Sequence, residues 1–456
     1  MKKKAITIIL SVAFIVLLCF ATACTEPQDV AQNEIMPNMA STIPEETSGT
    51  APPVMTGSAP QDNMSNVPSV PSSPAAQDNP QVTMLFTGDI MTHQSQIGNH
   101  YFNGQYDYSG DYAYIKDIVS KADIALANFE MTLPGKRPYT GFPRFRVPDA
   151  IADALYGAGF DIMATANNHI RDGGDDAFFR TNQVLRDKGF TVIGTKQESS
   201  GTKYAVIEKN GIKIGFINFT FNVNTGITRR IAPCINSDRT KSFSKSMNAI
   251  ASEIDEVKKE GAEFIILVIH WGTQYQIKSN ATQERIARKV SDMGVDLIIG
   301  GHPHVPQNVG EYQSPVSGKK TLIFYSLGNT IANMGYGFGP GHGYTETGTL
   351  ALVKLRRQQD GGVAIDDSGY ITTYLNKSMC TYKYDDAKGR ARTIKYRAYD
   401  IVPAALAIQN PNNYRGITKA SLRYFHDGLS NAQNTLGKYA DNLKSFKFQE
   451  YSDYPW

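Results

Sequence analysis

Histidine, carboxylate and amide side chains gather in a few short loops of this sequence. Five of its eight histidines lie in these loops, and two of them belong to the element Gly301-His302-Pro303-His304. Two histidines separated by one residue in a turn can face two different metal ions, although this element alone is a weak signal. Imidazole, carboxylate and amide oxygen together form the ligand set of Mn, Fe or Zn rather than that of a soft thiolate site. The pattern therefore predicts one or two divalent metal ions (Mn, Fe or Zn) as cofactors.

Each of these loops follows a short apolar run that is typical of a buried strand. In open α/β sheets, ligands bind beyond the carboxyl ends of the strands, so loops in this position should converge on one site. A carboxylate shared there would bridge two ions about 3.5–4 Å apart, an arrangement that clamps the attacking and leaving oxygens of a hydrolysis. The candidate residues, in chain order, are Asp89, His93, Asn128, Glu130, Asn167, Asn168, His169, His270, His302, His304, Ser326 and Asn329.

Each candidate also has an ordinary structural interpretation. A lone histidine such as His93 is more often a hydrogen-bonded structural residue, Asn168 is of a type that caps helices, and Glu130 could be a solvated loop acid. Only the combination of these loops in this order favours a metal site. Arg144 and Arg146 are candidates for binding an anionic group, because guanidinium presents a planar fork that suits carboxylate or phosphate. The alternative for both is a solvated loop arginine.

Alternating apolar strands and amphipathic helices must position these loops. Asn210-Gly211, between two apolar runs, predicts a hairpin. The alternation favours a layered α/β domain in which helices cover the faces of the sheets. The predicted strands are 82–87, 124–127, 161–165, 190–193, 204–208, 212–219, 264–269, 295–299, 321–325 and 349–355, and the predicted helices lie near 115–122, 148–158, 175–188, 247–257 and 286–293.

The first 80 residues have the composition of an export signal followed by a tether. Three lysines precede an apolar stretch from Ala5 to Ala21, as in a secretory signal. Ala21-Thr22-Ala23-Cys24 resembles a bacterial lipobox, so residues 1–24 are predicted to be a lipoprotein signal peptide with a lipid on Cys24; an uncleaved single-span anchor is the alternative. Residues 25–80 contain ten prolines and are predicted to be a disordered tether. We therefore expect a lipid-anchored protein on the outer face of the cytoplasmic membrane.

Composition and charge exclude several classes of protein. The chain has 456 residues, of which 41% are hydrophobic and 20% charged, so collagen-like, coiled-coil and wholly disordered chains are excluded. The signal contributes +3 and the tether −7 to a formal net charge of +3, which leaves +7 for the remainder. With no dense basic run in the sequence, this argues against a nucleic-acid partner. Four cysteines exclude a disulfide-rich scaffold; Cys234 and Cys380 could form one disulfide, but the sequence does not decide this.

Short motifs in the same loops resemble those of a known family. The motifs are Gly88-Asp89, NFE (128–130), ANNH (166–169), HWG (270–272), GHPHV (301–305) and YSLGN (325–329). They occur in the order seen in the CapA family, the poly-γ-glutamate capsule biosynthesis proteins, which are related in fold to calcineurin-like metallophosphoesterases. The resemblance spans residues 81–402 and implies a layered, metallophosphatase-like α/β fold with mixed sheets flanked by helices. Residues 403–456 are expected to form a C-terminal extension that is helical.

The resemblance also implies a role for each residue of the site. Two positions depart from the family pattern. Metallophosphoesterases usually have Asp-x-His at the first strand, where this chain has Met91, so the first metal would lack one ligand unless His93 reaches it. Gln274 stands where the family commonly has Glu. The implied roles are Asp89 and His304 on the first metal, Glu130 as the bridging carboxylate, Asn168, His270 and His302 on the second metal, and His169 as the acid that protonates the leaving group.

Three functions are compatible with this sequence. The resemblance implies a membrane-anchored, extracellular protein of poly-γ-glutamate capsule or cell-envelope polymer biosynthesis, with a metal-dependent, phosphoesterase-like hydrolase site. Its partners would be a phosphoester substrate or an anionic polymer such as poly-γ-glutamate. The alternative is a non-catalytic, polymer-binding or transport component of a membrane capsule-synthesis complex. A scaffold that keeps the fold and binds no metal is the third, since fold alone does not establish function.

Overall fold

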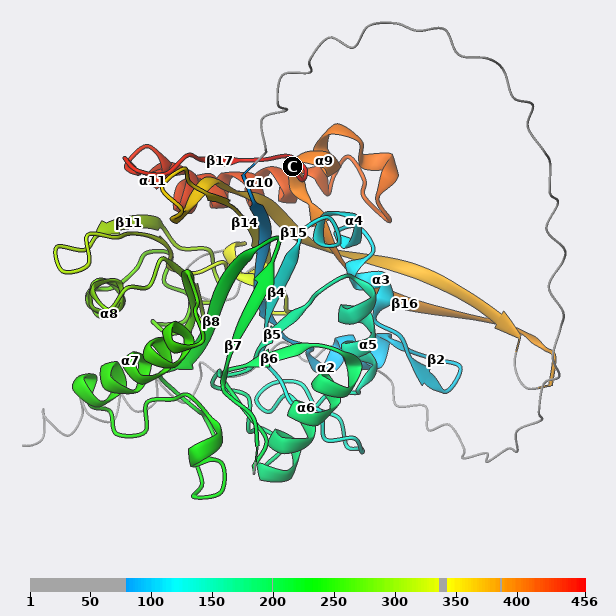
Figure 1. Ribbon diagram of the computed structural model, residues 1–456. Helices are drawn as coiled ribbons and strands as arrows, with labels where there is room; N and C mark the ends of the chain where they lie inside the picture. Colours follow the sequence, from blue (N-terminus) through cyan, green and yellow to red (C-terminus); the bar gives the residue numbers. More distant parts are fainter. Residues whose placement is uncertain (1–78, 199, 336–342, 386–387) are drawn as a thin grey trace, which may run out of the picture. The chain divides into compact units, whose positions relative to one another are not determined.

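Two mixed β-sheets form the centre of the fold (Figure 1). The computed structural model describes residues 79–456 except 199, 336–342 and 386–387. The predicted signal, Cys24 and nearly all of the predicted tether therefore lie outside the described residues. Among the described residues, no helix is both long and apolar enough to span a membrane.

The first sheet has nine strands. Strands β1, β4, β5 and β6 are parallel, and β14, β15 and β16 continue the sheet in antiparallel pairs. The order is β16 (Ala391–Pro403), β15 (Val363–Asp385), β14 (Thr347–Arg357), β1 (Gln81–Ile90), β4 (Ile124–Phe129), β5 (Ile162–Ala164) and β6 (Thr191–Ile193), while β13 (Asn329–Ile331) pairs with β1 and β17 (Phe448–Glu450) with β15.

The second sheet has six strands. Its four central strands are parallel and its two edge strands are antiparallel to their neighbours. The order is β11 (Val309–Gln313), β12 (Lys320–Phe324), β10 (Leu297–Gly301), β9 (Phe264–His270), β8 (Ile212–Thr220) and β7 (Tyr204–Lys209). A small separate hairpin is formed by β2 (Tyr101–Phe102) and β3 (Gln105–Tyr106).

The central strands are apolar on both faces because each face of each sheet is covered. In β1, Met84 and Phe86 pack with residues of the second sheet, whereas Leu85 points to the other face and packs with helical residues. Successive side chains of a strand point to opposite faces, so one continuous apolar run fills two cores. The layers are therefore helix, sheet, sheet, helix.

Helices cover the outer face of each sheet (Figure 1). On the second sheet, Met247, Ile250, Ile254 and Val257 form the buried stripe of α7. The helices flanking the first sheet are α2 (Gln94–Asn99), α3 (Ser109–Tyr112), α4 (Lys116–Val119), α5 (Ala150–Gly157) and α6 (Asp175–Lys188), and those on the second are α7 (Phe243–Lys259) and α8 (Ala281–Asp292). The predicted layered α/β architecture with mixed sheets flanked by helices is confirmed. The helix predicted near 115–122 is shorter, since α4 has four residues.

The chain after β16 packs back onto the first sheet. Helices α9 (Ala404–Gln409), α10 (Leu422–Ala432) and α11 (Lys438–Ala440) are followed by β17, which adds a strand to that sheet. Phe425 of α10 packs with Tyr374 of β15 in a separate apolar cluster. The segment 403–456 thus contains these three helices, joined by turns and irregular stretches, and also contributes a strand.

The two cysteines of the described residues are free thiols. Cys234 is buried and Cys380 half-buried. Burial raises the pKa of the Cys234 thiol. The disulfide that the sequence allows between them is absent from the described structure.

Candidate metal centre

The site lies where strands of both sheets end. Asp89 is at the end of β1 and Glu130 follows β4 in the first sheet, while His270 ends β9 and His302 follows β10 in the second. The parallel strands of each sheet bring their carboxyl ends to one edge, as the sequence predicts. Gly301 is required at this edge, because a Cβ there would lie 2.6 Å from Asp89 Oδ1.

Glu130 is the least satisfied polar side chain of the site. It is fully buried, and neither carboxylate oxygen has a hydrogen-bond partner. Burial, reinforced by the negative charge of Asp89, raises the pKa of Glu130 to about 8. A buried carboxylate without a partner is costly unless a cation compensates it. The residues present therefore fit a divalent ion.

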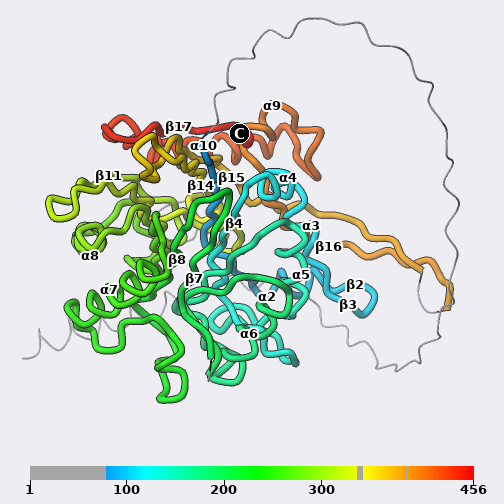
Figure 2. The backbone as a smooth tube through the Cα atoms, viewed as in Figure 1, coloured from blue at the N-terminus to red at the C-terminus, as the bar shows by residue number. Residues whose placement is uncertain are grey.

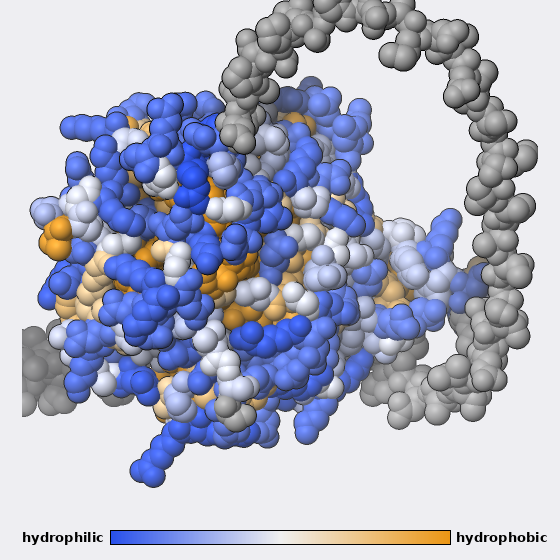
Figure 3. Space-filling view, viewed as in Figure 1, coloured by the Kyte–Doolittle hydropathy of each residue, from blue (hydrophilic) through white to orange (hydrophobic). Residues whose placement is uncertain are grey.

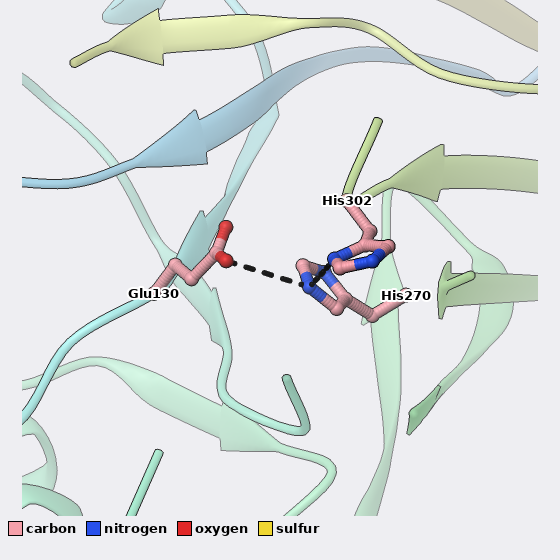
Figure 4. A group of neighbouring side chains, drawn as sticks. All are labelled: Glu130, His270 and His302. Carbon is pink, nitrogen blue, oxygen red and sulfur yellow. Dashed lines mark hydrogen bonds and ion pairs between the residues drawn. The ribbon is translucent and has the colours of Figure 1, made fainter. Parts of the chain in front are cut away.

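Two groups of side chains can hold a metal ion, and both contain Glu130. The first group consists of Asp89, Glu130 and His304, and the second of Glu130, His270 and His302. In Figure 4 the carboxylate of Glu130 points toward the ring of His270, whose Nε2 lies 3.5 Å from Oε1 and 3.1 Å from His302 Nδ1. Glu130 is thus placed where a bridging carboxylate would be.

The first group is built around an ionised Asp89. Its Oδ2 accepts the backbone N–H of His302 at 3.0 Å and lies 3.0 Å from His304 Nδ1, and Asn128 Nδ2 donates to Oδ1 at 2.7 Å. Burial alone would raise the pKa of Asp89, but the hydrogen bond and the charge of His304 outweigh it and hold the pKa well below its ordinary value. One of the two buried carboxyl groups is therefore charged, and Glu130 is the one that retains a proton while no cation is bound.

The second group presents uncharged imidazoles. Burial lowers the pKa of His270 to about 3, and burial also holds the pKa of His302 well below its ordinary value. The neutral ring is the form that binds a metal. Asn168 Oδ1 lies 2.8 Å from His270 Nε2, so an amide oxygen stands beside the same nitrogen.

His302 and His304 are held in an unusual backbone conformation. Their φ angles are +93° and +59°, in the region that residues with a side chain seldom adopt. Such a conformation persists where the surroundings fix it, and it occurs often at functional sites. Asn329 is one such support, because its amide donates to the His304 carbonyl at 3.2 Å and its Oδ1 lies 3.1 Å from His304 Nδ1.

His169 is oriented by a residue that the sequence analysis does not identify. Its Nδ1 lies 2.6 Å from Asp172 Oδ2, and its Nε2 lies 3.3 Å from Asn224 Nδ2. Asp172 Oδ2 also accepts the backbone N–H of Phe145 at 2.7 Å, so the carboxylate is itself fixed. The three-residue spacing of His169 and Asp172 in one turn is the signal that could have revealed this pair.

The remaining candidates lie around these groups. Asn128 and Asn167 are linked to the site by hydrogen bonds, since Asn167 Nδ2 lies 3.3 Å from Asn128 Oδ1 and donates to the Phe129 carbonyl at 2.8 Å. His93 is buried beside Phe145 and belongs to neither metal-capable group; its Nε2 has no partner. Ser326 is buried and accepts the backbone N–H of Gly328.

The two candidate arginines lie on one loop near the site. Arg144 is exposed and Arg146 half-buried, with its Nε lacking a partner. Their loop reaches the site through Phe145, whose ring centroid lies 4.7 Å from that of His169.

Met91 is fully buried in the apolar core on the helix-covered face of the first sheet. Gln274 Nε2 lies 3.4 Å from His304 Nε2, so this departure borders the first group.

Taken together, these features define a layered α/β protein with a metal-capable centre at the carboxyl ends of its strands. Residues 83–334, more than half of the chain, match the family described as bacterial capsule synthesis protein PGA_cap. The chain belongs to this family, and the predicted resemblance to the CapA family is confirmed.

Two relatives carry capsule-related names. The chain is 27% identical over 300 residues to the capsule biosynthesis protein CapA of Bacillus anthracis, which covers 63% of this chain and 67% of that protein. It is 26% identical over 284 residues to the PGA biosynthesis protein CapA of Bacillus subtilis (strain 168), which covers 60% and 68%. NAD nucleotidase (NadN) of Haemophilus influenzae aligns over 81% of this chain and 64% of that chain, less than two thirds of its length, with a TM-score of 0.38 and 14% identity. That likeness carries no argument about the site.

Proposed function

We propose that this protein is a metal-dependent hydrolase of capsule or cell-envelope polymer biosynthesis. Membership of the capsule synthesis family supports the process. The observation that carries the reaction class is the buried carboxylate of Glu130, which has no hydrogen-bond partner and is shared by two groups able to hold a metal ion. In a hydrolase that uses two ions, a carboxylate in this position can bridge them.

The proposal assigns roles to the residues of the site. Asp89, Glu130 and His304 would hold one ion, and Glu130, His270 and His302, with Asn168 beside them, a second. Divalent ions held there would supply Lewis-acid polarisation of an ester or amide bond and lower the pKa of a water molecule.

His169 would protonate the leaving group. The carboxylate of Asp172, 2.6 Å from Nδ1, keeps a proton on that nitrogen and leaves Nε2 to exchange protons with a substrate. Arg144 and Arg146, on the loop that reaches His169 through Phe145, would bind an anionic part of the substrate, either a phosphoester or a carboxylate of poly-γ-glutamate.

The location belongs to the same proposal. A lipid on Cys24 and a tether over residues 25–80 would hold the folded part outside the cytoplasmic membrane, next to a membrane capsule-synthesis complex. The basic start, apolar run and lipobox-like Ala21-Thr22-Ala23-Cys24 support this location.

The metal content of the purified full chain tests the proposal. We expect one or two equivalents of Mn, Fe or Zn by elemental mass spectrometry, and their loss in the double variant His302→Ala, His304→Ala. His426→Ala is the matched control, because His426 is exposed on α10 and belongs to neither metal-capable group. The metal-loaded protein is then assayed on phosphoesters and polyglutamate. Absence of bound metal after reconstitution contradicts the proposal.

A non-catalytic role in polymer binding or transport is the second candidate. The placement of Met91 in the apolar core favours it, because the first group then has three protein ligands instead of the four that an Asp-x-His strand end would give. Metal binding without turnover on any phosphoester or polyglutamate substrate would decide for this candidate.

A further inference from the structure

Two buried histidines lie at the two ends of helix α2. His93 directly precedes the helix and His100 directly follows it, and their exposed fractions are 7% and 5%. Figure 2 shows α2 among the helices that flank the first sheet, near α3 and α5. Because both rings are removed from water in the same part of the fold, their nitrogens need partners within the protein.

The two histidines differ in how their ring nitrogens are satisfied. Nδ1 of His100 lies 2.6 Å from the carbonyl oxygen of Gln96, and its Nε2 lies 2.7 Å from Asp111 Oδ1. By contrast, Nε2 of His93 is buried and has no hydrogen-bond partner among the described residues. Polar side chains cover most of the face seen in Figure 3, where water can satisfy them. A buried polar atom without a partner therefore requires an explanation.

His93 is held in this position by the chain around it. Gln96 Oε1 accepts the backbone N–H of His93 at 2.8 Å. Gly141 packs so closely against the same residue that a Cβ on it would lie 2.7 Å from the His93 carbonyl carbon. An unsatisfied buried donor or acceptor destabilises a folded protein, because it loses the hydrogen bonds that water would make. The ring thus stays buried at a cost in stability that its own contacts do not offset.

The ring of His93 borders the candidate site. The ring centroid of Phe145 lies 5.1 Å from that of His93 and 4.7 Å from that of His169, and both contacts are edge-on. Burial lowers the pKa of His93 to about 3. The charges of His304, Lys377 and His169 act in the same direction, so these three groups lie near the ring. His93 is therefore an uncharged imidazole beside both the first metal-capable group and the proposed general acid.

The surroundings of His93 favour an anionic occupant. His304, Lys377 and His169 are all positive when ionised, and each of them disfavours a positive charge on His93. Lys377 also pairs with Glu346, which offsets its charge but not the charges of the two histidines. An anionic oxygen is attracted by such groups. It also accepts a hydrogen bond from an uncharged imidazole that carries its single proton on Nε2.

We propose that Nε2 of His93 binds an anionic oxygen of the substrate, a carboxylate or a phosphoryl oxygen, next to His169 and the first metal-capable group. This inference deepens the proposed function and rests on it for the presence of a substrate at this site. The substrate oxygen supplies the partner that the nitrogen lacks in the free protein. His93 thus lowers the stability of the free protein and contributes to recognition, a trade-off that is common at functional sites.

Direct ligation of a metal ion is the less favoured role for His93. The ligand atoms of each metal-capable group lie within 4.8 Å of one another, and His93 belongs to neither group. A ligand would also be lost together with the metal, whereas a substrate-binding residue can be replaced without changing the metal content. The metal content of a His93 variant therefore separates the two roles.

Isothermal titration calorimetry with two probes, inorganic phosphate and succinate, tests the proposal on the full chain incubated with Mn²⁺. His93→Phe keeps an aromatic ring against Phe145 and removes both ring nitrogens. We expect its affinity for the bound probe to fall roughly tenfold or more, the effect of losing one hydrogen bond to a charged oxygen. The probe that shows the larger loss identifies the substrate oxygen as phosphoryl or carboxylate.

Thermal unfolding of the same variant supplies a second measurement. We expect the Tm of His93→Phe to rise by about 2 °C without probe, because carbon replaces a buried nitrogen that has no partner. His93→Gln can place an amide N–H near the position of Nε2, so it should restore most of the affinity. A gain in stability with a loss of binding is the opposite of what a packing residue would show.

His100→Gln is the matched control. His100 is equally buried at the other end of the same helix, but both of its ring nitrogens have partners. We expect this variant to lower the Tm, because it disturbs the contact with Asp111, and to leave the affinity for the probes unchanged. The two ends of α2 should therefore respond in opposite directions.

Three outcomes would overturn the inference. The first is equal affinity of the unaltered chain and His93→Phe, or no binding of either probe by the unaltered chain. The second is loss of metal in His93→Phe by elemental mass spectrometry, which would make His93 a ligand. The third is a fall in Tm for His93→Phe. A chain that holds no metal but binds a probe through His93 would contradict the proposed hydrolase and leave this inference standing.

Discussion

Nδ1 of His302 lies 3.1 Å from Nε2 of His270, so two imidazole nitrogens from neighbouring loops of the second sheet face each other. Burial keeps both rings uncharged, because it holds the pKa of each well below the ordinary value. At most one of these nitrogens can carry the proton that a hydrogen bond between them requires. A cation held there would accept a lone pair from both, and the carboxylate of Glu130, which has no hydrogen-bond partner and lies 3.5 Å from His270, would supply the balancing charge.

Glu130→Gln should stabilise the metal-free protein at alkaline pH. The pKa of Glu130 rises from an ordinary 4.5 to about 8 in the folded chain. Between these values folding takes up a proton, so the contribution of Glu130 to stability is present below about pH 4.5 and is lost as the pH rises through 8. At about pH 8.5 in chelator, we expect the variant to gain on the order of 2 kcal/mol in the free energy of unfolding.

Urea unfolding at about pH 5 and pH 8.5 measures this effect. The control is Glu208→Gln, because Glu208 is exposed on β7. The variant at position 130 should also lose metal, in contrast to its gain in metal-free stability. If the free energy of unfolding depends on pH in the same way for the Glu130→Gln variant and for the unaltered chain, Glu130 is charged in the folded, metal-free chain.

If the protein is the proposed hydrolase, His169→Gln should lower its turnover strongly without removing metal. His169 belongs to neither metal-capable group, and its proton is held by Asp172. We expect a loss of turnover of roughly 10²–10⁴-fold on a chromogenic phosphoester, the range for removal of a general acid. Metal content by elemental mass spectrometry should stay at the level of the unaltered chain. A variant that loses metal as well would assign His169 to the support of a metal group.

Asp172→Asn tests the orientation of that ring. The asparagine oxygen can still accept the backbone N–H of Phe145, so the loop is retained, but the carboxylate that orients the His169 ring through Nδ1 is gone. We expect kcat to fall roughly tenfold or more while KM is little changed. A change confined to KM would mean that Asp172 acts on substrate binding.

Gly88→Ala should destabilise the protein by about 2–3 kcal/mol. A Cβ at this position would lie 1.9 Å from the carbonyl oxygen of Gly328, a backbone atom that has no room to move without shifting the strand that carries Asn329. Gly98→Ala is the matched control, because nothing lies within 4 Å of the added carbon in helix α2. Thermal unfolding of both variants measures the difference, and equal stability would contradict the close approach.

Met91→His should not complete the first metal group. The Met91 side chain is fully buried in the core between the first sheet and its helices, so an imidazole there would be placed among apolar residues. We expect unchanged metal stoichiometry and a loss of about 2 kcal/mol. Met91→Leu, which conserves volume, should cost less than about 1.5 kcal/mol. An additional equivalent of metal in the histidine variant would show that the strand end can turn toward the site.

The apolar strands of both sheets are predictable because burial on two faces produces continuous apolar runs. The predicted strand 264–269 corresponds to β9 (Phe264–His270), and the predicted helix 175–188 to α6 (Asp175–Lys188). The β15–β16 hairpin is not predictable in this way, since its outer half alternates basic and aromatic residues on faces that no core covers. Its length follows from pairing between the two strands, which a local pattern does not reveal.

The candidate site is predictable as a set of loops but not as a set of contacts. The ends of β1, β4, β9 and β10 meet because parallel strands align their carboxyl ends, and this depends on fold class alone. Which histidine lies beside which carboxylate depends on the positive φ angles of His302 and His304. The residue types at these two positions do not predict such angles. The position of His93 beside Phe145 depends on the course of the long loop that carries Phe145. Residue types do not predict that course either.

Strand β17 has a consequence for the order in which the chain can fold. Its residues Phe448–Glu450 pair with Ser368–Tyr370, and Phe448 lies 5.6 Å from the rings of both Tyr370 and Phe324, which belong to different sheets. The ribosome synthesises these residues after the strands with which they pair and pack. The first sheet therefore stays open beside Ser368–Tyr370 until this late segment has been synthesised, and the contact between the two sheets through Phe448 is made last.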